Sequence, residues 1–317
     1  MFALERSDLN PLIEPRPENA WEEKSTFNPG GIYEDKMFHL FYRATSMYDI
    51  SSIGYAAFTS DMRISERPNH PVLTPDEEWE EFGCEDPRIT CVDDTYFMLY
   101  TAFSRRGPRI ALASGYDRRL FSKNGVIGPD IIDKDAMLFP EAIGGKLALI
   151  HRIESSIQIA YFDSEEFRNL GDPSFRSKYW KEYLHNLEAH TIMRPKEWWE
   201  ARKIGAGPPP IKTPEGWLVI YHGVDVNKVY RTGAALLDPN DPSKIVARSR
   251  TPILSPERPY EKNGIVNDVV FAQAAMVSDG VLYVFYGAAD KVCCLAVAKL
   301  EELLRWLLSK DSGNTLT

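Results

Sequence analysis

Residues 94–101 read DTYFMLYT, a polar turn followed by apolar side chains that end near a tyrosine. Such a segment is typical of a β-strand that leaves a hairpin turn. The same pattern recurs at 35–43 (DKMFHLFYR), 144–152 (GGKLALIHR), 215–222 (EGWLVIYH) and 279–287 (DGVLYVFYG). The residues at the equivalent end position are Tyr42, Tyr100, His151, Tyr221 and Tyr286. A fixed pattern that returns in this way indicates a repeat architecture.

Each of these predicted middle strands has a predicted strand on either side. The strands that follow are rich in small residues and lie at 53–60, 109–114, 157–163, 230–238 and 292–299. The strands that precede lie at 27–32, 86–91, 136–143, 207–212 and 268–277, and an outer segment recurs as PVLTP (71–75) and PILSP (252–256). Five units of three or four antiparallel strands predict an all-β protein, a five-bladed β-propeller. A β-sandwich also has many strands, but it does not give this fivefold order.

Three segments depart from the repeat. Between the third and fourth units, aromatic residues and leucines at helical spacing over 179–187 predict an amphipathic helix over the rim. Leucines at helical spacing predict a second helix at 300–310, packed on the side of the propeller. Residues 1–25 are expected to form an extended strap. No low-complexity linker divides the chain, so residues 1–317 are expected to form a single domain.

Composition restricts the classes of partner. The chain has 317 residues, 44% hydrophobic and 26% charged, with a net charge of −9. This charge argues against nucleic acid or an anionic membrane as a partner, and an anionic ligand requires a local cluster of cations. The N-terminus lacks signal-peptide features, and the four cysteines lack metal-ligand spacing. A cytoplasmic protein with buried, reduced thiols and no metal is therefore expected.

Residues 83–88 (GCEDPR) open the first strand of the second unit. Pro87 disfavours helical geometry at Asp86, so an extended conformation at the strand entrance is expected. A carboxyl group there can donate a proton if its pKa is raised. The alternative is an ordinary turn, in which Asp86 caps backbone N–H groups and Arg88 pairs with a neighbour.

Equivalent strand ends converge on the central funnel of a propeller. The residues at these positions are Asn28 and Arg43, then Glu85, Asp86 and Arg88, then Lys134, Asp135, Glu141 and Arg152, then Lys203, His222 and Tyr230, and finally Asn267, Asp268 and Asp290. Each alone also fits a structural role, such as a surface ion pair or a buried imidazole. Together they predict a funnel with carboxylates on one side and cations on the other.

This mixture of charges suits a many-hydroxyl substrate beside a small anion. Inverting glycosidic cleavage needs an acid for the leaving oxygen and a nucleophile on the opposite face of the sugar. A hydrolase activates water with a carboxylate base, whereas bound phosphate can be the nucleophile in a cationic pocket. Arg152, Lys203 and His222 favour phosphate.

Six ordered strings resemble glycoside hydrolase family 130: EDPR, LFPE, LIHR, KIGAGPPPI, IYHGV and YGAAD. The resemblance runs from about residue 28 to about residue 298. The family comprises β-mannoside phosphorylases and a few β-1,2-mannosidases, and its members are five-bladed propellers. The string VNDVVFAQAAM (266–276) departs from the family, in which a proline and a small polar or Cys-Gly pair commonly follow the phenylalanine.

The resemblance also implies roles for individual residues. Asp86 matches the general acid, which protonates the leaving oxygen through the mannose 3-hydroxyl. The residues implied for phosphate are Arg152, Lys203 and His222, with Tyr230, and with Lys134 where many members carry arginine. Arg43 and Asp290 match contacts to the sugar that is cleaved. The other funnel residues expected to bind substrate are Asn28, Glu85, Arg88 and Glu141.

The sequence therefore predicts an inverting phosphorylase that cleaves a β-mannoside with inorganic phosphate and gives α-mannose 1-phosphate. A β-1,2-mannobiose or β-1,2-oligomannan is the preferred substrate, with residues 164–199 shaping the acceptor side. Phosphate is a co-substrate, and no cofactor is expected. The alternatives are a β-1,2-mannosidase on the same scaffold and a glycan-binding propeller without catalysis. The linkage, the acceptor and the oligomeric state, including a homo-oligomer, are left open.

Overall fold

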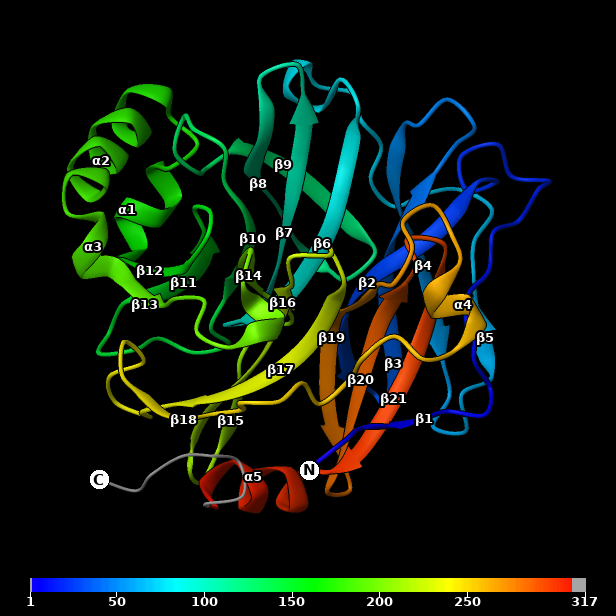
Figure 1. Cartoon of the computed structure of the whole chain (residues 1–317). Helices are drawn as coiled ribbons and strands as arrows, with labels where there is room; N and C mark the ends of the chain where they lie inside the picture. The colour runs from blue at the N-terminus through cyan, green and yellow to red at the C-terminus, as the bar shows by residue number, and fades with distance from the viewer. Residues whose placement is uncertain (1, 310–317) are drawn as a thin grey trace.

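The computed structural model describes residues 2–309, which form β-sheets accompanied by a few helices (Figure 1). The five predicted units are antiparallel meanders, which we call units 1 to 5. Unit 1 contains β2 (Ser25–Glu34), β3 (Met37–Thr45), β4 (Ser51–Phe58) and β5 (Ile64–Glu66), and unit 2 contains β6 (Gly83–Val92), β7 (Thr95–Ser104), β8 (Gly107–Asp117) and β9 (Leu120–Val126). Unit 3 contains β10 (Lys134–Leu138), β11 (Leu147–Arg152), β12 (Ile157–Phe162) and β13 (Thr191–Met193). Unit 4 contains β14 (Lys203–Ala206), β15 (Ile211–Thr213), β16 (Gly216–Val224), β17 (Tyr230–Leu237) and β18 (Ile245–Arg248). Unit 5 contains β19 (Val270–Ser278), β20 (Val281–Ala288), β21 (Val292–Lys299) and β1 (Glu5–Arg6).

Pairing within the units follows the predicted order, with local differences. The prediction of a single first strand at 207–212 in unit 4 is wrong. The structure has two short strands in this part of the chain, because β14 ends at Ala206 and β15 begins at Ile211. The prolines at 208–210 lie between them, and proline has no N–H group to donate to a sheet. In unit 5 the outer strand comes from the N-terminus, since Glu5 pairs with Val297.

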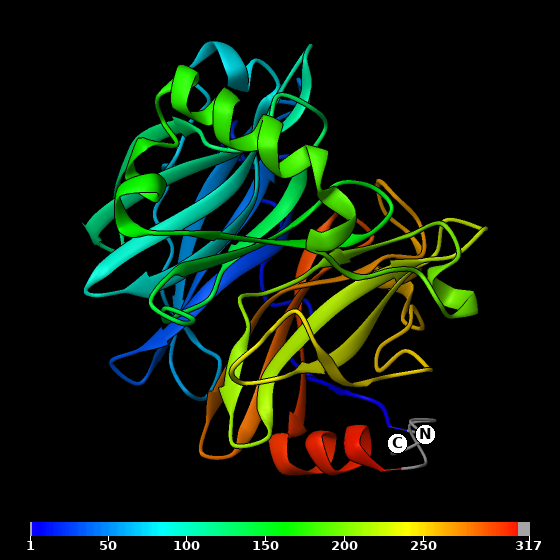
Figure 2. The same ribbon diagram turned by 90° about the vertical axis from the view of Figure 1, so that its left-hand side faces the viewer.

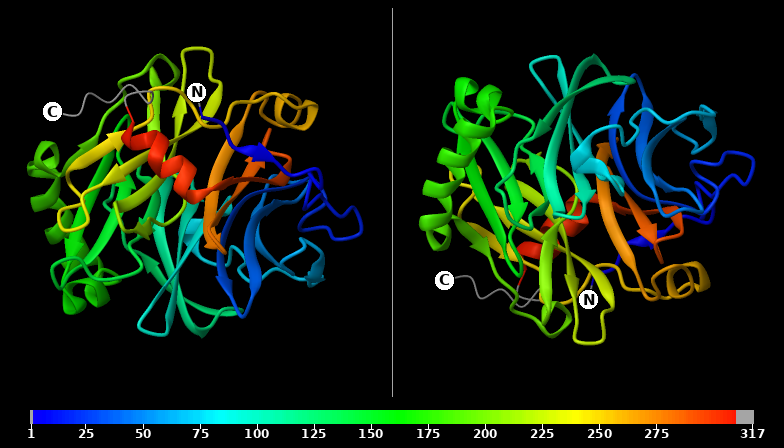
Figure 3. Two further views of the ribbon diagram at one scale, coloured as in Figure 1. Left: turned by 90° about the horizontal axis from the view of Figure 1, so that it is seen from below. Right: turned by 90° about the horizontal axis from the view of Figure 1, so that it is seen from above.

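The hydrophobic core is divided among the contacts between neighbouring units. Successive side chains of a strand point to opposite faces of its sheet. Met98 and Tyr100 of β7 therefore pack in a cluster with unit 1, whereas Leu99 packs in a cluster with unit 3. Further clusters join units 3 and 4, units 4 and 5, and units 5 and 1. The sheets accordingly lie around the middle of the molecule (Figure 3).

Three helices interrupt unit 3. They are α1 (Ser164–Asn169), α2 (Pro173–His185) and α3 (Leu187–His190). Asp163 and Asp172 cap α1 and α2 by accepting hydrogen bonds from backbone N–H groups of the first turn. Trp180 and Tyr183 of α2 pack in the cluster between units 2 and 3, and the helices cover this side of the molecule (Figure 2). The prediction of one helix between units 3 and 4 is corrected, because the chain returns from α3 into β13, which pairs with β12.

The other helices are short or terminal. They are η1 (Glu78–Glu80), η2 (Trp198–Glu200), α4 (Pro259–Lys262) and α5 (Leu300–Leu308). The predicted C-terminal helix is present as α5, and Leu303 and Leu307 bury its apolar face against units 4 and 5. Residue 310, its predicted end, and residue 1, the start of the predicted strap, lie outside the described residues.

The tyrosines of the repeat mark four buried clusters, which we call the tyrosine–glutamate clusters. In each, a fully buried glutamate accepts a hydrogen bond from the tyrosine and pairs with a cation of a neighbouring segment. They are Tyr42–Glu22–Arg67, Tyr100–Glu80–Lys123, Tyr221–Glu200–Arg248 and Tyr286–Glu261–Arg6. In unit 3, His151 instead bonds Asp133 through Nδ1 at 2.7 Å and Tyr183 through Nε2 at 2.8 Å. These clusters fasten the segments between units to the middle strands.

Cysteine burial differs from the prediction at one position. Cys84, Cys293 and Cys294 are buried, but Cys91 is exposed because its side chain points to the opposite face of β6 from those of its buried neighbours Thr90 and Val92. Within residues 2–309, the helices are all too short or too polar to span a membrane. The cytoplasmic location stays a prediction.

Candidate active site

The inner strands β2, β6 and β10 share a backbone kink at a polar residue, and Asp268, just before β19, has the same conformation. Asn28, Asp86, Asp135 and Asp268 have φ angles of 48°, 52°, 58° and 59°. Asparagine and aspartate tolerate this left-handed region better than most residues. Bulges at these points interrupt the register of β2, β6 and β10. The extended conformation predicted for Asp86 from Pro87 is therefore wrong, because the bulge requires a positive φ there.

A pocket of about 120 Å³ collects most of the predicted site residues. Its lining comes from all five units and the segments between them. It consists of Asn28, Arg43, Asp86, Lys134, Arg152, Lys203, His222, Tyr230 and Asp290, with Val266, Val269 and Phe271. Residues far apart in the sequence thus meet only because the units pack around a common centre.

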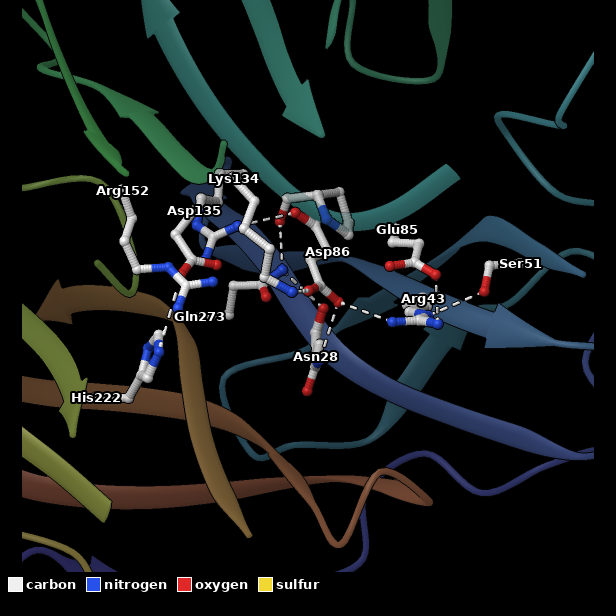
Figure 4. Close-up of polar contacts among 12 residues, drawn as sticks. Asn28, Arg43, Ser51, Glu85, Asp86, Lys134, Asp135, Arg152, His222 and Gln273 are labelled. Atoms are coloured by element: carbon white, nitrogen blue, oxygen red, sulfur yellow. Dashed lines mark hydrogen bonds and ion pairs between the residues drawn. The ribbon is translucent and has the colours of Figure 1, made fainter. Parts of the chain in front are cut away.

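Asp86 lies between cations and an amide (Figure 4). Asn28 Nδ2 donates to Asp86 Oδ1 at 2.9 Å, and Arg43 Nη1 lies 3.6 Å from the same oxygen. Lys134 Nζ lies 3.9 Å from Oδ2. Burial raises the pKa of Asp86, but Arg43 and Lys134 outweigh it and hold the pKa below its ordinary value. A general acid requires a raised pKa, and these cations shift the pKa of Asp86 in the opposite direction.

Arg43 is held in place by groups behind the pocket. Its Nη2 donates to Glu85 Oε1 at 2.6 Å, and its Nε donates to Ser51 Oγ at 2.9 Å. The guanidinium also lies over the ring of Phe27, 4.8 Å from the ring centre. Burial raises the pKa of Glu85. Glu85 was expected to bind substrate, but it is buried beside the pocket and orients Arg43.

Asp135 lies beneath the cationic side of the pocket and contacts three of its neighbouring basic side chains. It is fully buried, and its carboxylate lies 3.2 Å from Arg88 Nη2, 2.8 Å from Arg152 Nε and 3.8 Å from His222 Nε2. Burial raises the pKa of Asp135, but Arg152 and Arg88 outweigh it and keep the carboxyl ionised. A Cβ at Gly205 would lie 2.4 Å from Asp135 Oδ2, so the KIGAG segment needs a glycine here. Asp135 therefore fixes the position of Arg152 and His222.

Arg88 has a structural place rather than a place in the pocket lining. Besides Asp135, it donates to the carbonyl oxygens of Asp86, Ala206 and Gly207. Its side chain is 1% exposed. Arg88 links the kink of β6 to the first strand of unit 4. It does not line the pocket, so its position does not support the expected contact with substrate.

Arg152, Lys203, His222 and Tyr230 form the cationic side. Within residues 2–309, His222 Nδ1 is a buried polar atom without a hydrogen-bond partner, whereas Arg152 Nε has its ionic partner, the Asp135 carboxylate, 2.8 Å away. Burial lowers the pKa of His222 well below its ordinary value, so the ring is neutral at pH 7. Burial and the charge of Arg152 lower the pKa of Lys203. Two cations, a neutral imidazole and a phenol thus face one small volume, which suits an anion that also accepts hydrogen bonds.

Asp290 is the second carboxyl group that lines the pocket. Burial raises its pKa to about 6, although Arg43 acts in the opposite direction. Near neutral pH it therefore carries a charge that its surroundings stabilise poorly. A sugar hydroxyl can donate to such a carboxylate.

Some predicted positions lie elsewhere. Glu141 is half exposed and pairs with Lys212. The strand pair β10–β11 has Lys134 opposite Arg152 at the end near the pocket. Glu141 comes after the opposite end of β10 and therefore lies away from the pocket. The prediction that Glu141 binds substrate is therefore corrected. Residues 164–199, expected to shape the acceptor side, contribute nothing to the pocket lining in the described part of the chain.

Two residues near the pocket were missed from the sequence. Gln273 is fully buried and donates to the carbonyl oxygens of Asn28 and Pro87, so it joins two of the kinks. Gln273 lies in VNDVVFAQAAM (266–276), the string that departs from the family. A single amide side chain within an otherwise apolar strand could have identified it from the sequence. Glu154 accepts hydrogen bonds from Arg152 and Lys203. A turn glutamate in IESS carries no such signal. Residues 2–309 contain no group of three or more potential metal ligands.

A family model described as beta-1,4-mannooligosaccharide phosphorylase matches residues 7–309. The chain is 39% identical over 314 residues to a 1,2-beta-oligomannan phosphorylase of Thermoanaerobacter sp. (strain X514), covering 96% of this chain and 99% of the relative. It is 42% identical over 319 residues to a beta-1,2-mannobiose phosphorylase of the same organism, again with 96% and 99% coverage. A solved structure of a beta-1,2-mannobiose phosphorylase from Listeria innocua, in complex with beta-1,2-mannobiose, superimposes with a TM-score of 0.79 at 28% identity and covers 96% of this chain and 99% of that one.

These matches and the pocket define a carbohydrate-active β-protein of the mannoside phosphorylase class. The chain belongs to glycoside hydrolase family 130.

Proposed function

We propose that this protein is an inverting phosphorylase that cleaves a β-1,2-linked mannobiose or oligomannan with inorganic phosphate and releases α-mannose 1-phosphate. The observation that carries the proposal is the meeting of Arg152 of unit 3 with Lys203 and His222 of unit 4 in the pocket that also contains Asp86. The β-1,2 linkage is supported by the substrates named for the two Thermoanaerobacter relatives.

In this proposal the two sides of the pocket divide the reaction. Asp86 supplies the proton for the leaving oxygen, relayed through the mannose 3-hydroxyl as the family resemblance implies. Phosphate is held by Arg152, Lys203, His222 and Tyr230, with Lys134 nearby, and attacks the anomeric carbon from the opposite face. The C–O bond to the leaving sugar breaks as the bond to the phosphate oxygen forms, which inverts the configuration. Arg43, Asn28 and Asp290 hold the hydroxyl groups of the mannose unit.

Bound phosphate favours the protonation of Asp86 that proton donation requires. The pKa of Asp86 is held down mainly by the nearby cations, with a contribution from the Asn28 hydrogen bond. A phosphate anion beside Lys134 offsets the charge of this lysine and thereby raises the pKa of Asp86. Protonation of the acid is thereby linked to arrival of the nucleophile.

The same proposal includes the architecture and setting of the enzyme. We infer that the five units are the blades of a β-propeller within one catalytic domain, as supported by the five clusters that join neighbouring units and return from unit 5 to unit 1. The protein is proposed to act in the cytoplasm, with phosphate as co-substrate and without a metal or organic cofactor.

Mannobioses of different linkage, incubated with and without phosphate, test the proposal. We expect mannose 1-phosphate from β-1,2-mannobiose only when phosphate is present. Release of free mannose at the same rate without phosphate would instead indicate the β-1,2-mannosidase. Binding of the sugar with no product would indicate the non-catalytic glycan-binding protein.

A further inference from the structure

The pocket's two main cations share a carboxylate from their own chain. Arg152 Nη1 donates to Glu154 Oε1 at 3.0 Å, and Lys203 Nζ donates to the same oxygen at 2.8 Å. Arg152 ends β11 and Lys203 begins β14, so Glu154, in the turn after β11, joins two units at the edge of the pocket. One oxygen atom thus occupies the position between these cations.

The exposure of the three side chains is unequal. The side chain of Arg152 is 5% exposed and that of Lys203 is 23% exposed, whereas that of Glu154 is 56% exposed. Glu154 can therefore turn into solvent and be hydrated at little cost, since exposed ion pairs contribute little to stability. Arg152 keeps its contact with Asp135 when Glu154 leaves, so the guanidinium stays in place.

We propose that Glu154 competes with phosphate: its carboxylate pairs with Arg152 and Lys203 at the edge of the pocket, and phosphate must displace it to bind. The proposal rests on the proposed function, since it concerns the site assigned there to phosphate. A phosphate oxygen between Arg152 and Lys203 takes over both hydrogen bonds, and its other oxygens reach His222 and Tyr230. Glu154 then lowers the affinity for phosphate by competing for these donors and by repelling a second anion.

The opposite role for Glu154 predicts the opposite result. If Glu154 instead holds Arg152 and Lys203 in the geometry that phosphate needs, its removal weakens phosphate binding. The two roles are separated by the direction of the change in affinity, which a general structural role does not produce.

The test compares Glu154→Gln with Glu141→Gln. Glu141 is a matched control, because it is also about half exposed and also pairs with a lysine, Lys212, but lies outside the pocket. Inorganic phosphate is titrated calorimetrically into each full-length protein without sugar, and the phosphate KM and kcat are then measured with β-1,2-mannobiose. We expect Glu154→Gln to bind phosphate about threefold to tenfold more tightly, with a matching fall in phosphate KM, and Glu141→Gln to behave as wild type.

Unchanged or weaker phosphate binding by Glu154→Gln overturns the proposal, as does an equal gain in Glu141→Gln, which would reflect net charge alone. A wild-type protein that binds no phosphate and releases mannose without it overturns the proposed function itself. The two failures are therefore distinguishable.

Discussion

The pocket and the tyrosine–glutamate clusters both bury charges, but they satisfy them differently. In the cluster of unit 4, Glu200 accepts from Tyr221 at 2.7 Å and from Arg248 at 2.7 Å, and it also accepts two backbone N–H groups. In the pocket, His222 Nδ1 is buried without a hydrogen-bond partner within residues 2–309, and Arg152 and Lys203 share one carboxylate oxygen of the half-exposed Glu154.

The buried charges of the clusters are fully paired within the chain, whereas the polar groups of the pocket can still bind a ligand. A buried polar group without a partner costs stability, and where such a group lines a pocket it is available to a ligand. The clusters are complete without any ligand. Substitutions in the pocket should therefore lower activity, whereas substitutions in the clusters should lower the stability of the fold.

The largest expected effect is on turnover, at Asp86. Asp86→Asn keeps the size of the side chain but removes the acid. General-acid catalysis contributes roughly a hundredfold to ten-thousandfold, so we expect kcat to fall by about that factor, with the melting temperature and sugar affinity nearly unchanged. Steady-state kinetics, calorimetry and thermal melts check this, and a loss of tenfold or less removes Asp86 from the role of acid.

A cluster substitution should give the reverse pattern. Glu200→Gln leaves Arg248 buried without its ionic partner, and removal of one member of a buried pair costs about 3 kcal/mol or more. We expect a clear fall in the free energy of unfolding in urea, with an unchanged phosphate KM for the folded enzyme. Glu197→Gln, in the same turn but more exposed, is the control. Equal stability of the two variants would contradict the distinction between the regions.

A smaller effect is expected at Lys203, and only in the use of phosphate. Charge-assisted hydrogen bonds contribute about 1.5–3 kcal/mol each, so Lys203→Ala should raise the phosphate KM by about tenfold to a hundredfold and change sugar binding little. The same factor is expected for Arg152→Ala, with an added loss of stability because Asp135 loses a partner. Lys212→Ala, an exposed lysine outside the pocket, is the control. A phosphate KM that stays constant would place phosphate elsewhere.

The smallest effect concerns pH and Asp290. Its folded pKa of about 6 lies above its ordinary value of 3.8. The folded protein therefore holds this proton more tightly than the unfolded chain, so the contribution to stability is present at low pH and is lost as pH rises from about 4 to about 6. Asp290→Asn should gain stability relative to wild type over that interval. Thermal melts across the interval check this, and a difference that does not depend on pH would contradict it.

The sequence predicted the strands well because each middle strand repeats a turn and an apolar run. It predicted much of the pocket lining because Arg43, Arg152 and His222 stand at equivalent ends of these middle strands, and Asn28 and Asp86 stand at equivalent positions of first strands. The resemblance added roles to residues that the repeat had already brought together. Where the repeat is weak, as at the prolines after Ala206, the strand prediction failed.

The parts that could not be predicted depend on contacts between units. Glu141 belongs to a string that resembles the family, but its distance from the pocket follows from the register of β10 against β11. The positive φ at Asp86 follows from a bulge whose partners come from Gln273 and Asn28.

The tyrosine–glutamate clusters had a sequence signal that was overlooked. A proline stands five residues before each buried glutamate, and an aromatic residue stands directly before the glutamate. The four segments are 17–22 (PENAWE), 75–80 (PDEEWE), 195–200 (PKEWWE) and 256–261 (PERPYE). Their partners, such as Arg248 for Glu200, come from other segments and become apparent only in the folded protein.

Phosphate as the nucleophile, held by the cations of the pocket, can be tested directly by its products. Proton and phosphorus NMR of wild-type enzyme with β-1,2-mannobiose and phosphate follows every product. We expect one α-mannose 1-phosphate and one free mannose for each mannobiose consumed, with an equal loss of inorganic phosphate. Two free mannose molecules for each mannobiose, with phosphate unconsumed, would show that water is the nucleophile instead.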